Sequence, residues 1–459
     1  MASMTKLGMS LVLPVVLGLL VASGLPAAKK TTTRKPVAKK AAKSTPKTAQ
    51  RPSRTRLAPT PVPAYTVEEV LELARQTPME NVAALVPFFE QLYRNQNRTG
   101  DNRIHILHYG DSHTAADEWT GFLRALFQNR FGDGGSGWTH AGRPWNSFRR
   151  LDLRSYSSDG WYSDGLVGRS GDGLYGLGGV SITARRPRES VSLEVLCDSL
   201  EIFFLRQPGG GTLSFYDNGI FVERIATDGE TGPGYFRYTA TPGPHRFHLE
   251  TTDSAPVRLF GWVAEQGRGV TYETLGINGA QASIVFNWEE KLLAEHIGKR
   301  NPALIVLAYG TNEAGNSDWS RENYRDMFAS LIHRFRKMVP TASILVTGPP
   351  DRSIRTRGGW QTYDRVDRIV EAQREAALGT GCAFWDMRAK MGGKGSMPRW
   401  VSAGLAQTDY VHFTAAGYRL LGGAVFQDLM EHYGTFVKVR SELIGQDLQE
   451  RNGQTGENH

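Results

Sequence analysis

Apolar runs and amphipathic stretches alternate along most of the chain after residue 66. Short apolar runs predict strands at 103–109, 303–308, 343–347 and 382–386. Apolar residues at helical spacing predict helices at 119–132, 327–335 and 363–378, and a last helix from Thr414 onward. A strand followed by a helix, repeated in this way, is typical of a parallel sheet with helices on both faces. The sequence therefore predicts an α/β fold with three layers, α/β/α.

The alternation of strands and helices stops between residues 146 and 268, where short strand-like runs recur every 8–12 residues. These runs lie at 191–196, 200–205, 211–216, 220–225, 235–239, 246–250 and 257–263. Gly, Pro and Asp-rich turns separate them, as at Asp217-Asn218-Gly219. Such spacing favours an antiparallel β-sandwich. We expect this sandwich, 146–268, to be inserted into an α/β domain made of 66–145 and 269–437.

The N-terminal part of the chain has the composition of an export signal and a tether. Lys6 precedes an apolar run that continues to about residue 28, which predicts a signal peptide or a membrane anchor over 1–28. Residues 29–65 consist mostly of Lys, Ala, Thr and Pro, and we expect a disordered basic linker. At the other end, residues 438–459 form a polar tail that we also expect to be disordered.

Charge and cysteine content narrow the classes of function. Residues 1–62 contain twelve Lys and Arg and no acidic residue, so removing them from the net charge of +8 leaves −4 for 63–459. The basic tail is expected to act as a spacer or to contact anionic envelope polymers or lipid. Nucleic acid is not expected as a partner, because an exported tail lies outside the cytoplasm. The two cysteines, Cys197 and Cys382, exclude a disulfide scaffold and are expected to be separate buried thiols.

Candidate chemistry is concentrated in four short segments. Ser112 follows a predicted strand and precedes a helix, where a hydroxyl is exposed at the carboxyl edge of a parallel sheet. A serine nucleophile needs a base and an acid that orients the base, and Asp409-x-x-His412 supplies both. Gly279 and Asn312 offer a backbone N–H and a side-chain amide, which together with the Ser112 N–H would form an oxyanion hole. No metal is expected, since His105 and His108 should point to opposite faces of their strand, and no organic cofactor is expected, since a serine triad needs none.

These four segments together resemble the SGNH hydrolase (GDSL-type esterase) superfamily. The resemblance is carried by Gly110-Asp111-Ser112, Gly279, Gly310-x-Asn312 and Asp409-x-x-His412. It implies that Ser112 is the nucleophile and that Asp409 and His412 complete its triad. It also implies that Gly279 and Asn312 are oxyanion donors.

A narrower resemblance links the chain to bacterial peptidoglycan O-acetylesterases that carry an inserted sandwich similar to a carbohydrate-binding module. It is carried by the Gly-rich segment 134–138, by 143–145, by 276–280 and by the predicted insertion. The resemblance implies an exported esterase, in the periplasm or cell envelope, that removes O-acetyl groups from peptidoglycan or another acetylated glycan. Trp138 and Trp145 are candidates for stacking against sugar rings. We expect a monomer.

Three other functions stay open on the sequence. The same triad would serve an O-acetyltransferase that passes the acetyl group to a glycan hydroxyl. It would also serve a lipase or lysophospholipase, although no long apolar stretch suits an acyl tail. A wall-binding protein without catalytic activity is the third alternative.

Overall fold

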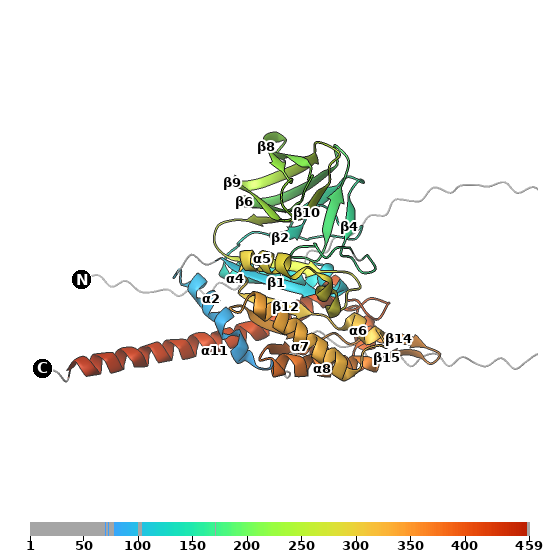
Figure 1. Ribbon diagram of the computed structural model, residues 1–459. Coiled ribbons are helices and arrows are strands. Elements are labelled where there is room, and N and C mark those ends of the chain that lie inside the picture. Colours follow the sequence, from blue (N-terminus) through green and yellow to red (C-terminus); the bar gives the residue numbers. More distant parts are fainter. Residues whose placement is uncertain (1–68, 70–71, 73–77, 100–102, 170, 457–459) are drawn as a thin grey trace, which may run out of the picture. The chain divides into compact units, whose positions relative to one another are not determined.

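The computed structural model describes residues 69, 72, 78–99, 103–169 and 171–456. Its centre is a parallel sheet of five strands in the order β11-β1-β12-β13-β16 (Figure 1). These strands are β1 (Ile104–Gly110), β11 (Val270–Gly276), β12 (Leu304–Ala308), β13 (Ser343–Thr347) and β16 (Ala383–Trp385). The predicted parallel α/β sheet is therefore confirmed. The strand at 270–276 was not predicted, although all seven of its residues are buried.

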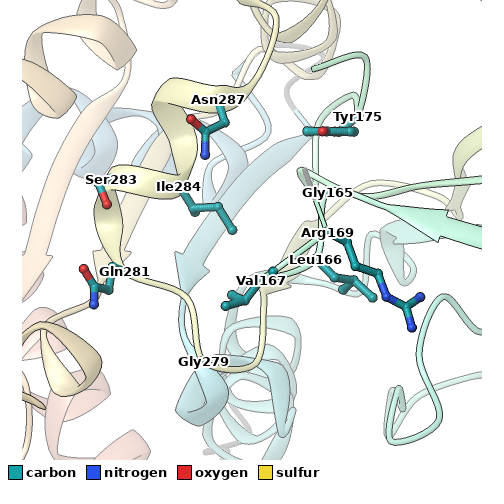
Figure 2. Close-up of a pocket in the computed structure, with 11 residues that line it drawn as sticks. Gly165, Leu166, Val167, Arg169, Tyr175, Gly279, Gln281, Ser283, Ile284 and Asn287 are labelled. Atoms are coloured by element: carbon teal, nitrogen blue, oxygen red, sulfur yellow. The ribbon is translucent and has the colours of Figure 1, made fainter. Parts of the chain in front are cut away.

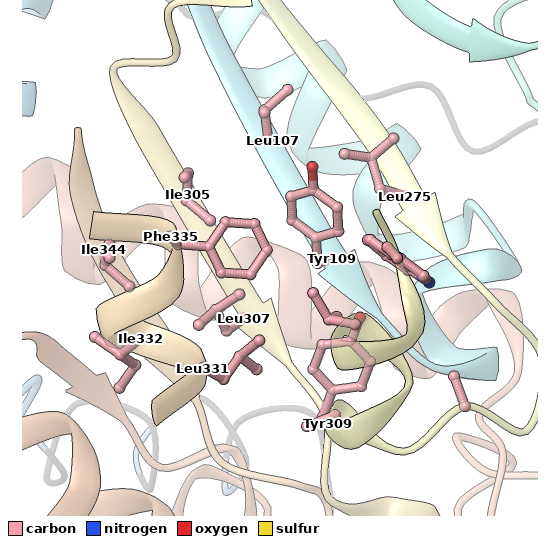
Figure 3. Packing of buried hydrophobic residues seen from close by; sticks show 14 of the residues in the cluster. Leu107, Tyr109, Leu275, Ile305, Leu307, Tyr309, Leu331, Ile332, Phe335 and Ile344 are labelled. Atoms are coloured by element: carbon pink, nitrogen blue, oxygen red, sulfur yellow. The ribbon is translucent and has the colours of Figure 1, made fainter. Parts of the chain in front are cut away.

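Helices cover both faces of this sheet, because alternate residues of each strand point to opposite sides. One face packs against α2 (Val86–Gln96), α4 (Glu118–Phe131) and α11 (Ala415–Gly456). The other packs against α5 (Glu290–Arg300), α7 (Arg321–Met338) and α8 (Arg365–Gly379). Figure 3 shows Leu107, Tyr109 and Leu307 of the sheet facing Leu331 and Phe335 of α7. Shorter helical turns are η1 (Val82–Leu85), α3 (Ser112–Ala115), η2 (Ala282–Asn287), α6 (Thr311–Gly315), α9 (Met387–Lys390) and α10 (Met397–Ser402).

The region between β1 and β11 forms a second sheet of nine antiparallel strands, which confirms the predicted inserted β domain. The strands are β2 (Gly137–His140), β3 (Arg154–Ser157), β4 (Tyr162–Asp164), β5 (Ser181–Ala184), β6 (Ser190–Arg206), β7 (Thr212–Asp217), β8 (Ile220–Ala226), β9 (Gly232–Thr251) and β10 (Val257–Glu265). Many of their buried side chains, among them Leu193, Phe215 and Trp262, share one core. A separate hairpin is formed by β14 (Ser353–Thr356) and β15 (Gly359–Thr362).

Three details of the insertion differ from the sequence prediction. The runs at 191–196 and 200–205 are one strand, β6, and those at 235–239 and 246–250 are also one strand, β9. The pairing of β6 with β9 shifts register between Cys197 and Ser199 but continues beyond it, so turn-like residues produce an irregularity and not a chain reversal. In addition, β2 pairs with β10, which places the start of this sheet at Gly137 and not at 146.

The structure tests the prediction for the C-terminal residues but not the prediction for the N-terminal ones. The predicted disordered tail after Val437 was wrong, since α11 continues as helix to Gly456. Arg440 of this helix binds Glu90 of α2 at 2.7 Å, a tertiary contact that hydropathy does not reveal. The signal or anchor predicted at 1–28 and the linker predicted at 29–65 lie outside the described residues. Among the helices that the structure describes, none is long and apolar enough to cross a membrane.

Buried ion pairs join the insertion to the parallel sheet. The guanidinium of Arg300, on α5, binds Glu273 of β11 and lies 2.8 Å from Glu265 of β10. All three residues are buried. Removing one partner of such a pair would leave an uncompensated charge, at a cost of about 3–5 kcal/mol. These pairs connect the β domain to the strand that leads to Gly279.

Candidate active site

The candidate site lies where neighbouring parallel strands end together. Gly110, the last residue of β1, is in register with Gly276 of β11 and with Ala308 of β12. The segments that carry Ser112, Gly279 and Asn312 consequently leave the sheet side by side. The strand order reverses at β1, and the crevice at such a switch point is the usual ligand site of an open α/β sheet.

Ser112, His412 and Asp409 form a hydrogen-bonded line. The Ser112 Oγ lies 2.9 Å from His412 Nε2, and His412 Nδ1 lies 2.7 Å from Asp409 Oδ2. The other carboxylate oxygen of Asp409 accepts hydrogen bonds from the backbone N–H groups of Val411 and His412. Partial burial raises the pKa of Asp409, but the hydrogen bonds from the His412 ring and these backbone groups outweigh it and hold the pKa below its ordinary value. An ionised Asp409 favours a proton on Nδ1 of His412, which leaves Nε2 free to take the proton of Ser112.

The loop that carries the acid and the base is supported by an aromatic stack. Tyr410 lies between Asp409 and His412 in the sequence. Its φ of 59° is a backbone conformation that residues other than glycine rarely adopt. Its ring stacks on Trp360 of β15 with 4.0 Å between centroids and an interplanar angle of 13°. The backbone N–H of Ser353, on β14, also donates to the Tyr410 carbonyl at 3.0 Å. The β14–β15 hairpin therefore braces this loop, a role for Trp360 that the sequence did not suggest.

Three predicted oxyanion donors are available at the same sheet edge. Among the described residues, the backbone N–H groups of Ser112 and Gly279 donate to no protein acceptor. Gly279 has a φ of 75°, a conformation that favours glycine. The Asn312 amide donates one hydrogen to the Ala280 carbonyl at 2.9 Å, which orients the group and leaves its second N–H free.

Glu313, which sequence reasoning missed, ties two of these segments together. Its carboxylate accepts from the Ala282 N–H at 2.7 Å and from the Gly310 N–H at 3.0 Å. The Tyr324 hydroxyl also donates to it, at 3.2 Å. Burial raises the pKa of Glu313 to about 7 despite these hydrogen bonds. Its place directly after Asn312 was the one signal in the sequence that pointed to this role.

Two further buried groups surround the serine. Asp111 caps α3 by accepting from the His113 N–H at 3.0 Å, and burial raises its pKa to about 6 against the effect of this hydrogen bond. His113 lies with its ring centroid 5.2 Å from that of His412, and its Nδ1 is 2.9 Å from the Tyr418 hydroxyl. Burial lowers the pKa of His113 to about 3, so a neutral ring packs against the candidate base.

Trp138, a predicted sugar-stacking residue, is not placed to contact a sugar. This residue is completely buried in β2, where its ring meets Gly178 and Gly261, so the prediction of a sugar contact was wrong. The two glycines leave room for the Trp138 ring in the protein interior, and only the tertiary fold shows that they lie beside it. Trp145 is half-buried and packs edge-on against His140 and Phe148. Its assignment to substrate binding stays a prediction.

The remaining sequence-based expectations concern metal and sulfur. Within the residues that the structure describes, no group of three or more His, Cys, Asp or Glu side chains is placed to hold a metal ion. His105 contacts Arg300, and His108 contacts the Tyr272 hydroxyl at 2.8 Å. The prediction of separate buried thiols is confirmed for Cys197 and Cys382.

A cavity of about 340 Å³ opens beside Gly279 (Figure 2). One wall is the turn at 165–169, which belongs to the inserted domain, and the opposite wall is formed by η2. Val167 of the turn would lie 4.0 Å from a Cβ atom placed on Gly279. The insertion thus contributes directly to the surroundings of the candidate oxyanion hole.

Comparison with known proteins agrees with this geometry. Residues 238–420 match the family model of the GDSL-like lipase/acylhydrolase family. The chain thus carries a GDSL-like lipase/acylhydrolase domain and is a serine ester hydrolase. The match includes Gly279, Asn312, Asp409 and His412 but begins after Ser112, within β9 of the inserted sheet. A search of curated protein sequences finds no match.

Among solved structures, one described as a peptidoglycan O-acetylesterase is similar over most of its length. It is 26% identical, with a TM-score of 0.66, and the match covers 76% of this chain and 96% of that one. A family two carbohydrate esterase from Clostridium thermocellum is 12% identical, with a TM-score of 0.28 over 55% of this chain and 95% of that one. A family two carbohydrate esterase from Cellvibrio japonicus is also 12% identical, with a TM-score of 0.26, and the match covers 60% of this chain and 98% of that one. The last two similarities carry no weight for substrate or mechanism.

Proposed function

We propose that this chain is an exported acetylesterase that removes O-acetyl groups from peptidoglycan by a Ser112–His412–Asp409 triad. The observation that carries the proposal is the hydrogen-bonded line of these three side chains at the switch point of the sheet, with distances of 2.9 and 2.7 Å. The similarity to a solved peptidoglycan O-acetylesterase supports the substrate. The apolar N-terminal run supports export.

The reaction follows from the positions of the donors and acceptors. His412 Nε2 takes the Ser112 proton as Oγ attacks the acetyl carbonyl, and a bond forms between Oγ and the carbonyl carbon. The backbone N–H groups of Ser112 and Gly279 and the Asn312 amide stabilise the negative charge that develops on the carbonyl oxygen. His412 then gives the proton to the sugar oxygen, so the carbon–oxygen bond breaks and the glycan leaves.

Water completes the cycle on the acetyl-serine. His412 removes a proton from the water, the resulting hydroxide attacks the acetyl carbonyl, and the same donors hold the second oxyanion. Return of the proton to Ser112 Oγ releases acetate. Asp409 stays ionised throughout and stabilises the protonated imidazole of His412.

The test is acetate release by the full chain from O-acetylated peptidoglycan, measured beside Ser112→Ala. We expect the variant to lower kcat by about 10³-fold or more. Ser330→Ala, on the exposed side of α7, is the matched control and should keep full activity. If the protein hydrolyses a small aryl acetate in a Ser112-dependent way but releases no acetate from peptidoglycan, the assignment of peptidoglycan as the substrate is wrong. Transfer of the acetyl group to an added acceptor sugar in place of acetate release would overturn hydrolysis, and turnover that survives in Ser112→Ala would overturn the triad.

A further inference from the structure

The cavity beside Gly279 is larger than an acetyl group needs, and it has a chemistry of its own. Its volume of about 340 Å³ lies within the range of about 300–1,000 Å³ that is usual for small-molecule sites. In Figure 2, Ile284 of η2 and Val167 of the facing turn point into the space between the two walls. These side chains give the cavity an apolar lining next to the candidate oxyanion hole.

Amide groups on the η2 side are positioned to donate hydrogen bonds. Gln281 accepts with its Oε1 from the indole N–H of Trp319 at 2.9 Å and from the Asn316 amide at 3.5 Å. Because the oxygen is occupied in this way, the amide nitrogen is the end that is left for a ligand. Asn287, at the far end of η2, adds a second amide to the lining.

A positive charge lies at the edge of the cavity, where the exposed side chain of Arg169 leaves the turn on the side away from Gly279 (Figure 2). Arg169 is the one charged residue in its lining, and no acidic side chain is among the described residues that line it. The turn that bears Arg169 is closed by two backbone hydrogen bonds, from the Arg169 N–H to the Leu166 carbonyl at 2.8 Å and from the Gly165 N–H to the Arg169 carbonyl at 3.2 Å. These bonds fix the backbone from which the Arg169 side chain starts, and a guanidinium suits a carboxylate because it can make paired hydrogen bonds with it.

We propose that this cavity is a subsite for the glycan next to the scissile ester, and that it selects acetylated glycans that bear a carboxylate. The amides of Gln281 and Asn287 contact sugar hydroxyls inside the cavity, and Arg169 contacts the carboxylate at its outer edge. The proposal rests on the proposed function, because it places the ester at Gly279. It assigns substrate selection to the inserted domain, which provides Arg169, and not only to the domain that provides the triad.

Binding to the unreactive Ser112→Ala protein tests the subsite independently of turnover. The probes are soluble O-acetylated peptidoglycan fragments, which carry carboxylates, and acetylated chitooligosaccharides of equal length, which carry none. We expect Arg169→Ala to raise the Kd of the charged probe about threefold to fivefold relative to that of the neutral probe, the range for a partly exposed ion pair. Arg169→Glu should raise this ratio about tenfold or more, because repulsion replaces attraction. Added salt should lower the preference of the parent protein for the charged probe.

Two further variants test whether the effect is specific to the charge at Arg169 and whether the glycan occupies the cavity. Arg368→Ala removes an exposed arginine from α8, outside the cavity, and should leave both Kd values unchanged. Asn287→Trp, at the end of the cavity away from Gly279, should fill it and weaken both probes about tenfold or more. Thermal unfolding of each variant checks that the fold is kept.

The outcomes distinguish this inference from the proposed function. If Arg169→Ala and Arg169→Glu leave the ratio of the two Kd values as it is, selection of a carboxylate by Arg169 is overturned. If Asn287→Trp leaves both Kd values unchanged, the cavity does not hold the glycan. A failure of Ser112-dependent acetate release would overturn the proposed function, and the binding measurements would still decide the subsite.

Discussion

The carboxylate of Glu313 accepts a hydrogen bond from the backbone N–H of Ala282 at 2.7 Å, inside the protein and out of contact with solvent. Its second oxygen accepts from Gly310. The two candidate oxyanion segments, one after β11 and one after β12, are therefore joined by one side chain. Glu313 is a positioning residue, since it contacts the backbone of these segments and not the reacting atoms.

Glu313→Gln should lower kcat about 10-fold to 100-fold, because an amide has one acceptor oxygen and its NH₂ group would face a backbone N–H. We expect KM for a small aryl acetate to change much less than kcat. Steady-state kinetics give this comparison, and Glu322→Gln on the exposed side of α7 is the control. A variant that loses thermal stability but keeps kcat would show that Glu313 serves the fold alone.

Asp409→Asn should lower kcat about 10³-fold to 10⁴-fold with little change in stability. Asparagine can still accept from the backbone N–H groups of Val411 and His412, but its NH₂ would point at His412 Nδ1. That arrangement puts the imidazole proton on Nε2, which can then no longer accept the proton of Ser112. Single-turnover kinetics measure the effect, with Asp318→Asn on the surface as control. Activity within tenfold of the parent would contradict the role given to Asp409.

Trp360→Ala should reduce kcat about threefold to tenfold on every ester, since an aromatic pair contributes about 0.5–1.5 kcal/mol. The indole supports Tyr410, whose strained backbone sets the positions of Asp409 and His412. Trp360→Phe keeps a ring in the stack and should restore most of the activity. If Trp360→Ala instead changes only KM, and only for glycans, Trp360 contacts substrate and does not brace the loop.

Acid should destabilise the fold below pH 6.5. Burial lowers the pKa of five histidines to about 3, namely His105, His108, His113, His140 and His296. Between pH 6.5 and 3 the unfolded chain takes up protons that the folded chain does not, so stability is complete above pH 6.5 and decreases as the pH falls. The raised pKa values of Asp111, Glu313, Asp351, Asp386 and His245 act in the opposite direction. The largest of these rises, to about 6 for Asp111 and about 7 for Glu313, are smaller than the fall from 6.5 to about 3 at each of the five histidines.

His296→Leu tests this account at one residue. Both ring nitrogens of His296 are buried without a hydrogen-bond partner among the described residues, and the ring lies against Phe203 and Phe260. We expect the variant to be more stable by about 1 kcal/mol at pH 7.5 and by about 1 kcal/mol more at pH 5.5. Urea unfolding at the two pH values measures this, with His333→Leu on the exposed side of α7 as control. An equal effect at both pH values would contradict the pH argument.

The sequence by itself was sufficient for four of the five strands of the parallel sheet and for the main candidate residues. Periodicity located β1, β12, β13 and β16 to within about two residues, because a buried parallel strand is a continuous apolar run. The four motif segments could be recognised because each is a short run of residues whose types are set by the reaction: a nucleophile, a base with its acid, and hydrogen-bond donors. Periodicity missed β11, in which Thr271, Glu273 and Thr274 interrupt the apolar run although all are buried.

Only the tertiary structure decided how distant residues meet. Three hundred positions separate Ser112 from His412, and their 2.9 Å contact depends on the register of β1 and on the loop before α11. The burial of Trp138, the bracing of Tyr410 by Trp360 and the link from Glu313 to Ala282 all depend on neighbours that are remote along the chain. Local propensity acts over a few residues, whereas packing and buried hydrogen bonds depend on which surfaces the fold brings together.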